Sequence, residues 1–381
     1  MKQGKLAKKD LLFVIMVIAI VAYLAIMPDL YKSPYARLEE RYVARVVETD
    51  NSLVRQYGIV KTGVQRLKVR ILEGPWKGET FDASNYLTGK MELDKIFKNR
   101  DKVYVIMVED DKGGLRVTAY DHYRLWVQAL LIGFFTILLV IFAGRGGIRV
   151  MLSLIATLVF LWKIMFPAIL KGNDPFWVAI GIVTTITGIT LFLIAGVGRT
   201  ALIAWTGTFM GIFLTALLAY FLFPVFRLHG AMQPFSETLL YSGFDQLDLS
   251  RLFITSVFIG ASGAVADISI DVAAAMREVV RKRPEITKLE LIGSGLSVGR
   301  AASGVMITTL LMAYMSGNIA FLMILVSRGI PAAQILNMNY VAAELLKVIV
   351  GGFGLITVVP FTAIIGGLLF KRGHGYEKFK P

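Results

Sequence analysis

Long apolar segments separated by short polar loops make up most of this 381-residue chain. A helix that crosses a bilayer needs about 20 predominantly apolar residues, and eight segments meet or approach that length. We predict membrane-spanning helices at residues 11–27, 125–143, 148–170, 176–196, 201–223, 251–271, 291–315 and 352–370. The pattern therefore predicts an α-helical polytopic membrane protein with about eight spans.

Residues 28–124 have a different pattern, with no segment long enough to span. Apolar and polar residues alternate in RYVARVVE (41–48), QRLKVRIL (65–72), KVYVIMVE (102–109) and GLRVTAY (114–120). Such alternation is typical of half-buried strands, and the Gly and Asp residues between the runs indicate turns. We predict a small β-rich, barrel-like domain of five or six strands, with a helical stretch near residues 91–97.

The chain thus divides into an N-terminal membrane anchor (1–27), the β-rich domain (28–124), a multi-span domain (125–371) and a basic tail (372–381). Lys and Arg concentrate in cytoplasmic loops. The basic N-terminal flank, the loop Arg277–Lys288 and the basic pair Lys371 and Arg372 therefore all favour the cytoplasmic side. We expect both termini in the cytoplasm and residues 28–124 outside it.

Residues 318–350 admit two interpretations. The apolar run Ile319–Val326 is too short to cross a bilayer, Gly329 and Pro331 interrupt it, and the residues that follow are amphipathic. A re-entrant hairpin entering from the outside keeps eight crossings, whereas two short spans give ten with the same location of the termini. Interrupted helices at membrane depth recur at transporter substrate sites, which favours the hairpin.

Composition agrees with a membrane protein and excludes other classes. The chain is 56% hydrophobic and 18% charged, against about 45–50% and about 25% in soluble domains. Basic cytoplasmic loops account for much of the net charge of +14, so we expect a lipid bilayer and no nucleic acid as partner. Cysteine is absent and only three histidines are present. This argues against thiolate and histidine-rich metal sites, and the sequence leaves any other metal site undetermined.

Three charged residues in or near the predicted spans are the strongest candidates for a transport path. Asp267 and Asp271 are four residues apart, so they share one helix face. Arg300 is on the next helix, at nearly the same distance from the turn at Pro284 as Asp267. A charge at such depth costs on the order of 2.5–3.5 kcal/mol and is normally paired or faces a cavity. We expect Asp267 and Arg300 to pair inside the bundle, either lining the path or as a structural pair.

A second polar group, Asn337, Asn339 and Glu344, supplies further path candidates if residues 318–350 are re-entrant. Lys347 follows Glu344 by three residues, so an ion pair within one helix is the simpler account. Small residues in the two helices around Pro284 predict close helix packing, because they let backbones approach each other in lipid. The glycines among them are Gly260, Gly263, Gly295, Gly299 and Gly304.

Four longer strings carry a family resemblance. They are ETDNSLVRQYGIVKTGVQRLKVRILEG (48–74), AMQPFSETLLYSGFDQLDLSRLF (231–253), GASGAVADISIDVAAAM (260–276) and SGLSVGRAASGVMITTLLMAY (294–314). Together they resemble the YibE/F-like family of bacterial membrane proteins, and the long extramembrane domain makes the chain similar to the YibE members. The resemblance implies a multi-pass protein of the bacterial cell membrane, a YibF-like membrane partner and a loosely assigned transporter or permease function. It implies no catalytic or substrate residue.

We expect a membrane transporter or permease for a small polar solute or ion. It is not driven by ATP by itself, since no nucleotide-binding motif is present, and we expect no cofactor. The alternative is a membrane scaffold or assembly protein whose outer β-domain binds a partner, and a homo-oligomer is compatible with both. We do not expect an enzyme, because Asp267 and Asp271 lie on one helix and do not converge from two, and no histidine lies in a predicted span.

Overall fold

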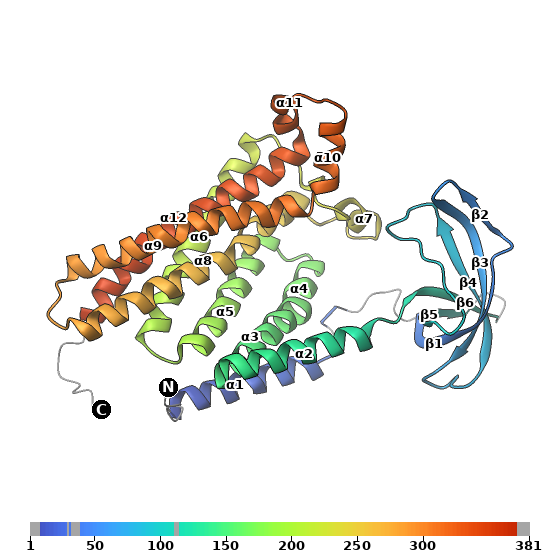
Figure 1. Ribbon diagram of the computed structural model, residues 1–381, viewed down its shortest axis with the longest axis horizontal. Helices are drawn as coiled ribbons and strands as arrows, with labels where there is room; N and C mark the ends of the chain where they lie inside the picture. The colour runs from blue at the N-terminus through green and yellow to red at the C-terminus, as the bar shows by residue number, and fades with distance from the viewer. Residues whose placement is uncertain (1–7, 29, 32–38, 110–113, 372–381) are drawn as a thin grey trace. The chain divides into compact units, whose positions relative to one another are not determined.

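The computed structural model describes residues 8–28, 30–31, 39–109 and 114–371. They belong to two compact units, one formed by Met1–Tyr31 with Phe142–Pro381 and the other by Lys32–Ile141. The elements, labelled in Figure 1, are α1 (Lys8–Ile26), β1 (Glu39–Asp50), β2 (Val54–Tyr57), β3 (Val60–Ile71), β4 (Thr80–Thr88), β5 (Lys102–Glu109), β6 (Leu115–His122), α2 (Leu125–Ala143), α3 (Arg145–Phe160), η2 (Leu161–Met165), α4 (Phe166–Leu170), α5 (Pro175–Ala195), α6 (Arg199–Val225), η3 (Gly230–Met232), α7 (Ser236–Tyr241), α8 (Leu249–Lys282), α9 (Lys288–Ser316), α10 (Ile319–Ser327), α11 (Ala332–Asn337) and α12 (Asn339–Lys371).

The strands of the unit Lys32–Ile141 form one sheet, with hydrogen-bonded neighbours in the order β1–β5–β6–β4–β3–β2. β1 also pairs with β3, from Ala44 opposite Ile71 to Asp50 opposite Arg66, so the sheet closes into a small barrel. Every second residue of β3 is buried from Gln65 to Ile71, as expected for a strand with one face on a core. The predicted β-rich domain is confirmed. Its four predicted runs correspond to β1, β3, β5 and β6.

Residues 91–97 form turns and irregular backbone, so the helical stretch predicted there is wrong. A buried amide network holds this segment on the sheet. Gln65 Nε2 donates to Phe97 O (2.8 Å), and Gln65 Oε1 accepts from Phe97 N (3.0 Å). Asn85 Nδ2 donates to Lys95 O (2.6 Å) and to Gln65 Oε1 (3.1 Å). Side chains of β3 and β4 thus take backbone groups that a helix would have paired internally.

Asp94 fixes the beginning of the same segment. Its carboxylate accepts hydrogen bonds from Thr88 N (2.9 Å) and Gly89 N (2.6 Å). Burial alone raises the pKa of Asp94, but these hydrogen bonds favour the charged form more strongly and hold the pKa below its usual value. Asp94 therefore stabilises the fold above the ordinary carboxyl pKa, and this contribution is lost as the pH falls through the lowered pKa of the folded state.

We expect Gln65→Met to destabilise the β-domain by roughly 2–5 kcal/mol, because it leaves the backbone groups of Phe97 and the amide of Asn85 buried without partners. Gln56→Met is the control, since Gln56 is exposed and its amide donates to Gly58 O, its one side-chain hydrogen bond within the described residues. It should change the free energy of unfolding by less than about 0.5 kcal/mol. Urea unfolding of residues 39–122, followed by the fluorescence of Trp76, measures both. Equal stability of Gln65→Met and the unsubstituted domain would contradict the proposed role of the network.

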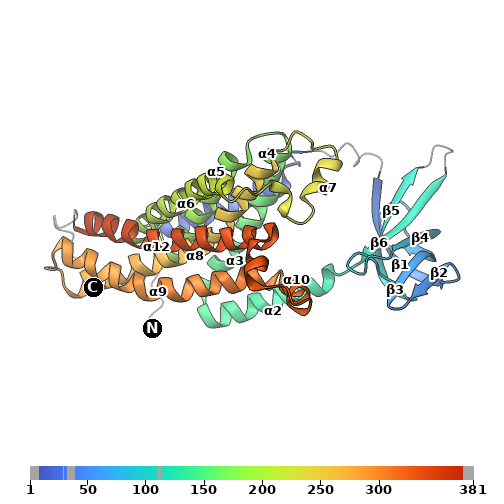
Figure 2. The same ribbon diagram turned by 90° about the horizontal axis from the view of Figure 1, so that it is seen from above.

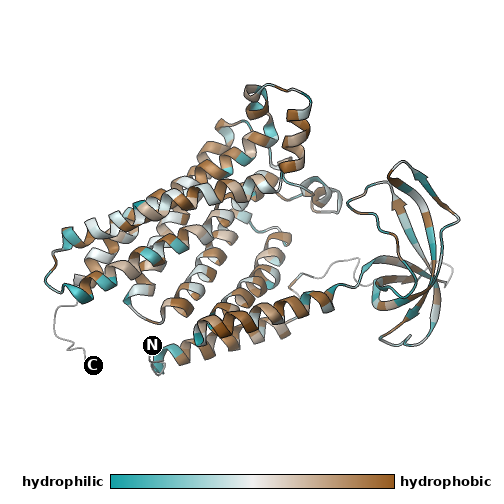
Figure 3. Cartoon of the chain, viewed as in Figure 1, coloured by the Kyte–Doolittle hydropathy of each residue, from teal (hydrophilic) through white to brown (hydrophobic). Residues whose placement is uncertain are grey.

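Eight helices of the described residues are long and apolar enough to cross a membrane. They are α1, α2, the continuous helix formed by α3, η2 and α4, and α5, α6, α8, α9 and α12. The π-helical turn η2 ends just before Pro167, which lacks a backbone donor. Figure 3 shows these helices as mainly hydrophobic, with hydrophilic residues gathered where a loop joins α8 to α9. The number of candidate spans equals the number predicted from the sequence.

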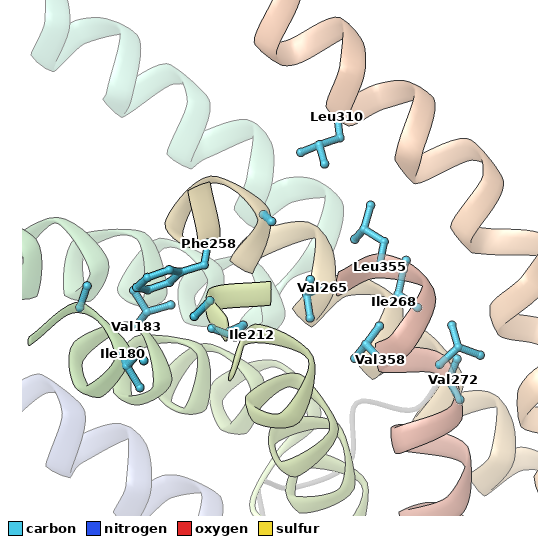
Figure 4. Packing of buried hydrophobic residues seen from close by; sticks show 14 of the residues in the cluster. Ile180, Val183, Ile212, Phe258, Val265, Ile268, Val272, Leu310, Leu355 and Val358 are labelled. Atoms are coloured by element: carbon cyan, nitrogen blue, oxygen red, sulfur yellow. The ribbon is translucent and has the colours of Figure 1, made fainter. Parts of the chain in front are cut away.

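The core of the helical unit lies where α5, α6, α8, α9 and α12 meet. Figures 1 and 2 show α6, α8 and α12 side by side. In Figure 4, Phe258 and Val265 of α8 lie among Val183 of α5, Ile212 of α6 and Val358 of α12. Over the 18-residue stretch long enough to cross a membrane, α8 is 61% buried, more than the corresponding stretch of any other candidate span in the described chain. It is the central helix around which the others pack.

The structure does not form the predicted re-entrant hairpin from residues 318–350. These residues belong to three separate helices, α10, α11 and the beginning of α12. α12 runs unbroken from Asn339 to Lys371, so residues 339–350 are the first turns of the last long helix. Before them lie α10, with nine residues, and α11, with six. The helix continues through the amphipathic stretch because Glu344 and Lys347 pair with each other, while Leu346 and Val350 are buried in the bundle.

We expect a single cysteine at Lys61, an exposed residue of β3, to react with an impermeant maleimide in intact cells. The reason is that the basic loops favour a location of the β-domain outside the cytoplasm. A cysteine at Lys282, the exposed last residue of α8, should react only after the inner face is opened. Because the chain has no cysteine of its own, each label reports one position. The opposite pattern at the two positions would overturn this topology.

Candidate functional site

An acidic stripe runs along the exposed side of α8. The helix buries residues over most of its circumference, and the side left exposed is narrow. It carries Gly260, Gly263, Asp267, Asp271 and Ala274, which recur every three or four residues and so lie one above another. Asp267 and Asp271 therefore share one face, as their spacing predicted. Both are near the middle of α8, far from either end of the helix.

Arg300 does not pair with this stripe. It is exposed on α9, and in the described part of the chain no ion pair joins it to Asp267 or Asp271. The expectation of a buried Asp267–Arg300 pair is therefore wrong. Asp267 and Arg300 are at nearly equal distances from Pro284 along the chain. This spacing gives their positions along the two helices but does not give the direction in which either side chain points around its helix axis. Gly299 turns inward, and the next residue is rotated by about 100°, which takes Arg300 to the surface.

The five glycines predicted to mediate helix packing behave differently from one another. Gly260, Gly295 and Gly299 lie against Tyr314 of α9, Met276 of α8 and Val359 of α12, respectively. A side chain at any of the three would collide with its neighbour. Gly263 and Gly304 are exposed, with no atom within 4 Å of the place a Cβ would take, so the packing predicted for these two is wrong within the described chain.

A nearly buried ion pair lies close to the start of α12. Lys347 Nζ is 2.8 Å from Glu344 Oε1, and the two side chains are 12% and 13% exposed. The ammonium of Lys347 also lies 5.2 Å from the centre of the Phe253 ring of α8, within the range of a cation–π interaction. The pair within one helix that the spacing predicted is confirmed.

Tyr314, near the end of α9, adds a polar group that the sequence analysis missed. Its hydroxyl is buried, without a hydrogen-bond partner among the described residues, and the charge of Glu344 acts on it. Buried polar groups are nearly always hydrogen-bonded. This end of the bundle therefore has an unused hydrogen-bonding group beside an ion pair. In the sequence, Tyr314 lies near the end of an apolar segment, where tyrosine is common at the membrane surface, so the sequence did not indicate a buried hydroxyl.

Asn337 and Asn339 do not join the Glu344 pair. They lie at the end of α11 and the start of α12, respectively. Both are exposed, and in the described chain no side-chain hydrogen bond connects either to Glu344. The structure thus separates these two path candidates from Glu344.

Two aspartates join the beginnings of α5 and α8. Asp174 caps α5 and Asp248 caps α8. Arg251 forms ion pairs with both, and its Nε is 3.4 Å from Asp248 Oδ2. An aspartate directly before an apolar helix is a usual N-cap, which could have identified the two caps but not the arginine between them.

No cluster of three or more His, Asp or Glu residues that could hold a metal ion is found among the residues that the structure describes. Asp267 and Asp271 alone supply two carboxylates, fewer than a dedicated protein site for a divalent ion uses.

A small β-barrel joined to eight helices long and apolar enough to cross a membrane, with two carboxylates in the middle of the central helix, is the architecture of a candidate polytopic membrane protein. Residues 131–372 match the family described as YibE/F-like protein, and residues 31–122 match the YibE/F family N-terminal domain. The chain belongs to the YibE/F family. Comparison with curated proteins and with solved structures finds no match.

We expect a double-mutant cycle to show strong coupling between Glu344 and Lys347. Glu344→Gln or Lys347→Gln alone should each destabilise the protein by about 3–5 kcal/mol, since each leaves one charge buried without its partner, whereas the double change should be far milder. The control is Glu278 and Arg281, which have the same spacing on α8 but are exposed and should couple by about 0.5 kcal/mol or less. Unfolding of the detergent-solubilised protein measures both cycles, and additive effects at Glu344 and Lys347 would refute the coupling.

Proposed function

We propose that the protein is a permease of the bacterial cell membrane that moves a small polar solute or ion and is not driven by ATP by itself. The observation that carries this proposal is the acidic stripe. Asp267 and Asp271 lie near the middle of α8, the central helix of the bundle, on its exposed side, and no partner for either is present within the described residues.

The cost of such an arrangement supports a functional role. A carboxylate at the centre of a bilayer costs on the order of 2.5–3.5 kcal/mol on insertion scales, and charged residues inside spans usually face water-filled cavities or ion pathways. Two carboxylates one turn apart attract cations, as acidic rings do in cation-selective channels. We therefore infer that the transported species is a cation, or a solute with a cationic group, and that it passes along the stripe.

The small residues of the stripe fit this role. Gly263 lies one turn before Asp267 with no atom within 4 Å of the place a Cβ would take, and Ala274 follows Asp271, so neither neighbour on the stripe carries a bulky side chain. The Glu344–Lys347 pair lies elsewhere along the bundle. Phe253, which Lys347 contacts, is 14 residues before Asp267, or about 21 Å along α8 at a rise of ~1.5 Å per residue. We assign this pair to the support of the helix end rather than to the path.

We expect proteoliposomes that contain the protein to carry H⁺, Na⁺ or K⁺ down an imposed gradient, detected with entrapped ion-sensitive dyes. Asp267→Asn and Asp271→Asn should each lower the flux about tenfold or more, because each removes a charge from the path. Glu278→Gln is the matched control, since Glu278 is exposed near the end of the same helix and pairs with Arg281. It should leave the flux within about twofold of the unsubstituted protein.

All variants are compared at equal incorporation and equal melting temperature, so that loss of fold is not read as loss of flux. Unchanged flux in both aspartate variants would remove the stripe from the path. The absence of any cation flux from the unsubstituted protein would contradict the proposal itself.

The second candidate function is a membrane scaffold whose β-domain binds a partner, and one surface feature favours it. Tyr57 and Ile59, at the turn between β2 and β3, are 63% and 78% exposed. Large apolar side chains gathered at one exposed tip are a common feature of protein contact sites. A protein that carries no cation in the flux assay, with this hairpin intact, would favour the scaffold.

A further inference from the structure

A hollow lies where the β-domain meets its membrane helix. It has a volume of about 540 Å³ and is lined by Arg100, Asp101, Lys102, His122, Tyr123 and Trp126. All of these residues belong to the unit Lys32–Ile141, from the segment before β5 to the first turn of α2. Neither of the functions discussed above uses this hollow.

The charges around the hollow do not cancel. Arg100 and Lys102 are exposed, and neither forms an ion pair with any residue in the described ranges. Asp101 is the one carboxylate among the residues that line the hollow. It already accepts a hydrogen bond from the protein backbone. Its Oδ2 accepts from Lys98 N (2.8 Å) and lies 3.8 Å from His122 Nδ1. The hollow therefore presents two cationic side chains to whatever enters it.

The backbone holds these side chains in place. Arg100 has a φ of 74°, and its N–H donates to Val46 O of β1 (2.8 Å). Tyr123 N donates to Lys102 O (2.8 Å), which ties the start of α2 to β5. The ring of His122 lies edge-on to Phe97, with 4.7 Å between ring centres, and Phe97 is the residue that Gln65 fixes on the sheet. Positive φ in a residue other than glycine recurs at functional sites because the surrounding structure must enforce it.

The position of the hollow along the chain points to the membrane surface. α2 begins at Leu125, and none of its residues is buried in the protein. It is also among the most apolar of the candidate spans. Trp126 is the second residue of α2. Tyr123 lies two residues before the first residue of the helix. Tryptophan and tyrosine concentrate where a span meets the headgroups of the bilayer, so the hollow is at headgroup level when α2 is inserted.

We propose that this hollow binds the phosphate-bearing headgroup of an anionic phospholipid. Arg100 and Lys102 contact the phosphate through charge-assisted hydrogen bonds, and Trp126 lies beside the upper part of the acyl chains. A phosphate could also come from solution as the free ion. The apolar surface of Trp126, 59% exposed, favours the lipid, since free phosphate has no apolar part to contact it.

The test uses the full-length protein in a neutral detergent and a phosphatidylethanolamine whose headgroup carries a dansyl group and keeps one negative charge. Energy transfer from tryptophan to dansyl is measured, and the part contributed by Trp126 is obtained by comparison with Trp126→Phe. Phosphatidylglycerol, phosphatidylcholine and inorganic phosphate are then added as competitors. The site variant is Arg100→Gln with Lys102→Gln. The matched control is Arg55→Gln with Lys61→Gln, which removes two exposed cations from β2 and β3 of the same domain.

We expect phosphatidylglycerol to displace the probe at a concentration about tenfold lower than phosphatidylcholine. Both lipids carry a phosphate, but the choline cation cancels its charge and is repelled by Arg100 and Lys102, whereas phosphatidylglycerol keeps a net negative charge. The site variant should lose this preference and the control variant should keep it. Lys102→Gln alone should lose part of the preference, which gives a second measurement if the double variant does not fold. Equal competition by the two lipids, or an unchanged preference in the site variant, would overturn the proposal. Displacement by inorganic phosphate at the same concentration as phosphatidylglycerol would assign the hollow to free phosphate and refute the lipid.

Discussion

The close approach of α6, α8 and α12 determines which residues of the bundle are exposed. Gly207 of α6 lies against the hydroxyls of Ser269 and Thr362, which are themselves 2.8 Å apart. Gly354 of α12 lies against the hydroxyl of Thr215 on α6. Apolar side chains gain little by leaving lipid for a neighbouring helix, so tight packing and hydrogen bonds must hold such helices together. Most of the circumference of α8 is buried in these contacts, and the acidic stripe is the side that remains exposed.

The same constraint explains how far the sequence could predict the candidate site. Hydropathy located the candidate spans because it depends on composition along the chain, and the spacing of Asp267 and Asp271 placed both on one face. The direction in which a helix turns depends on its neighbours. Gly299 packs on Val359 of α12, a contact 60 residues away in the sequence, and this contact decides that Arg300 points outward. Spacing in the sequence gives the position of a residue along its helix, whereas its direction around the helix axis depends on the neighbouring helices.

The β-domain shows a similar division. Alternation along β1, β3, β5 and β6 reports local burial, so the strands could be predicted from the sequence. The segment 91–97 resembles a helix locally, with MELDKIF carrying apolar residues at helical spacing. Its structure is decided by two buried amides, Gln65 and Asn85, which come from strands. A buried amide inside an alternating run looks like one more polar residue until its partners are known.

Some charged side chains have partners within the protein, and others have none among the described residues. The carboxylates of Glu344 and Asp101 are engaged within the chain, Glu344 by Lys347 and Asp101 by the backbone N–H of Lys98, and these contacts hold helix and sheet in place. Asp267 and Asp271 in the helices, and Arg100 and Lys102 in the β-domain, have no such partner among the described residues. A charge kept without a partner near a low-dielectric region costs free energy. That cost is recovered when a ligand of opposite charge binds, which is why the unpaired groups carry the inferences about cations and phosphate.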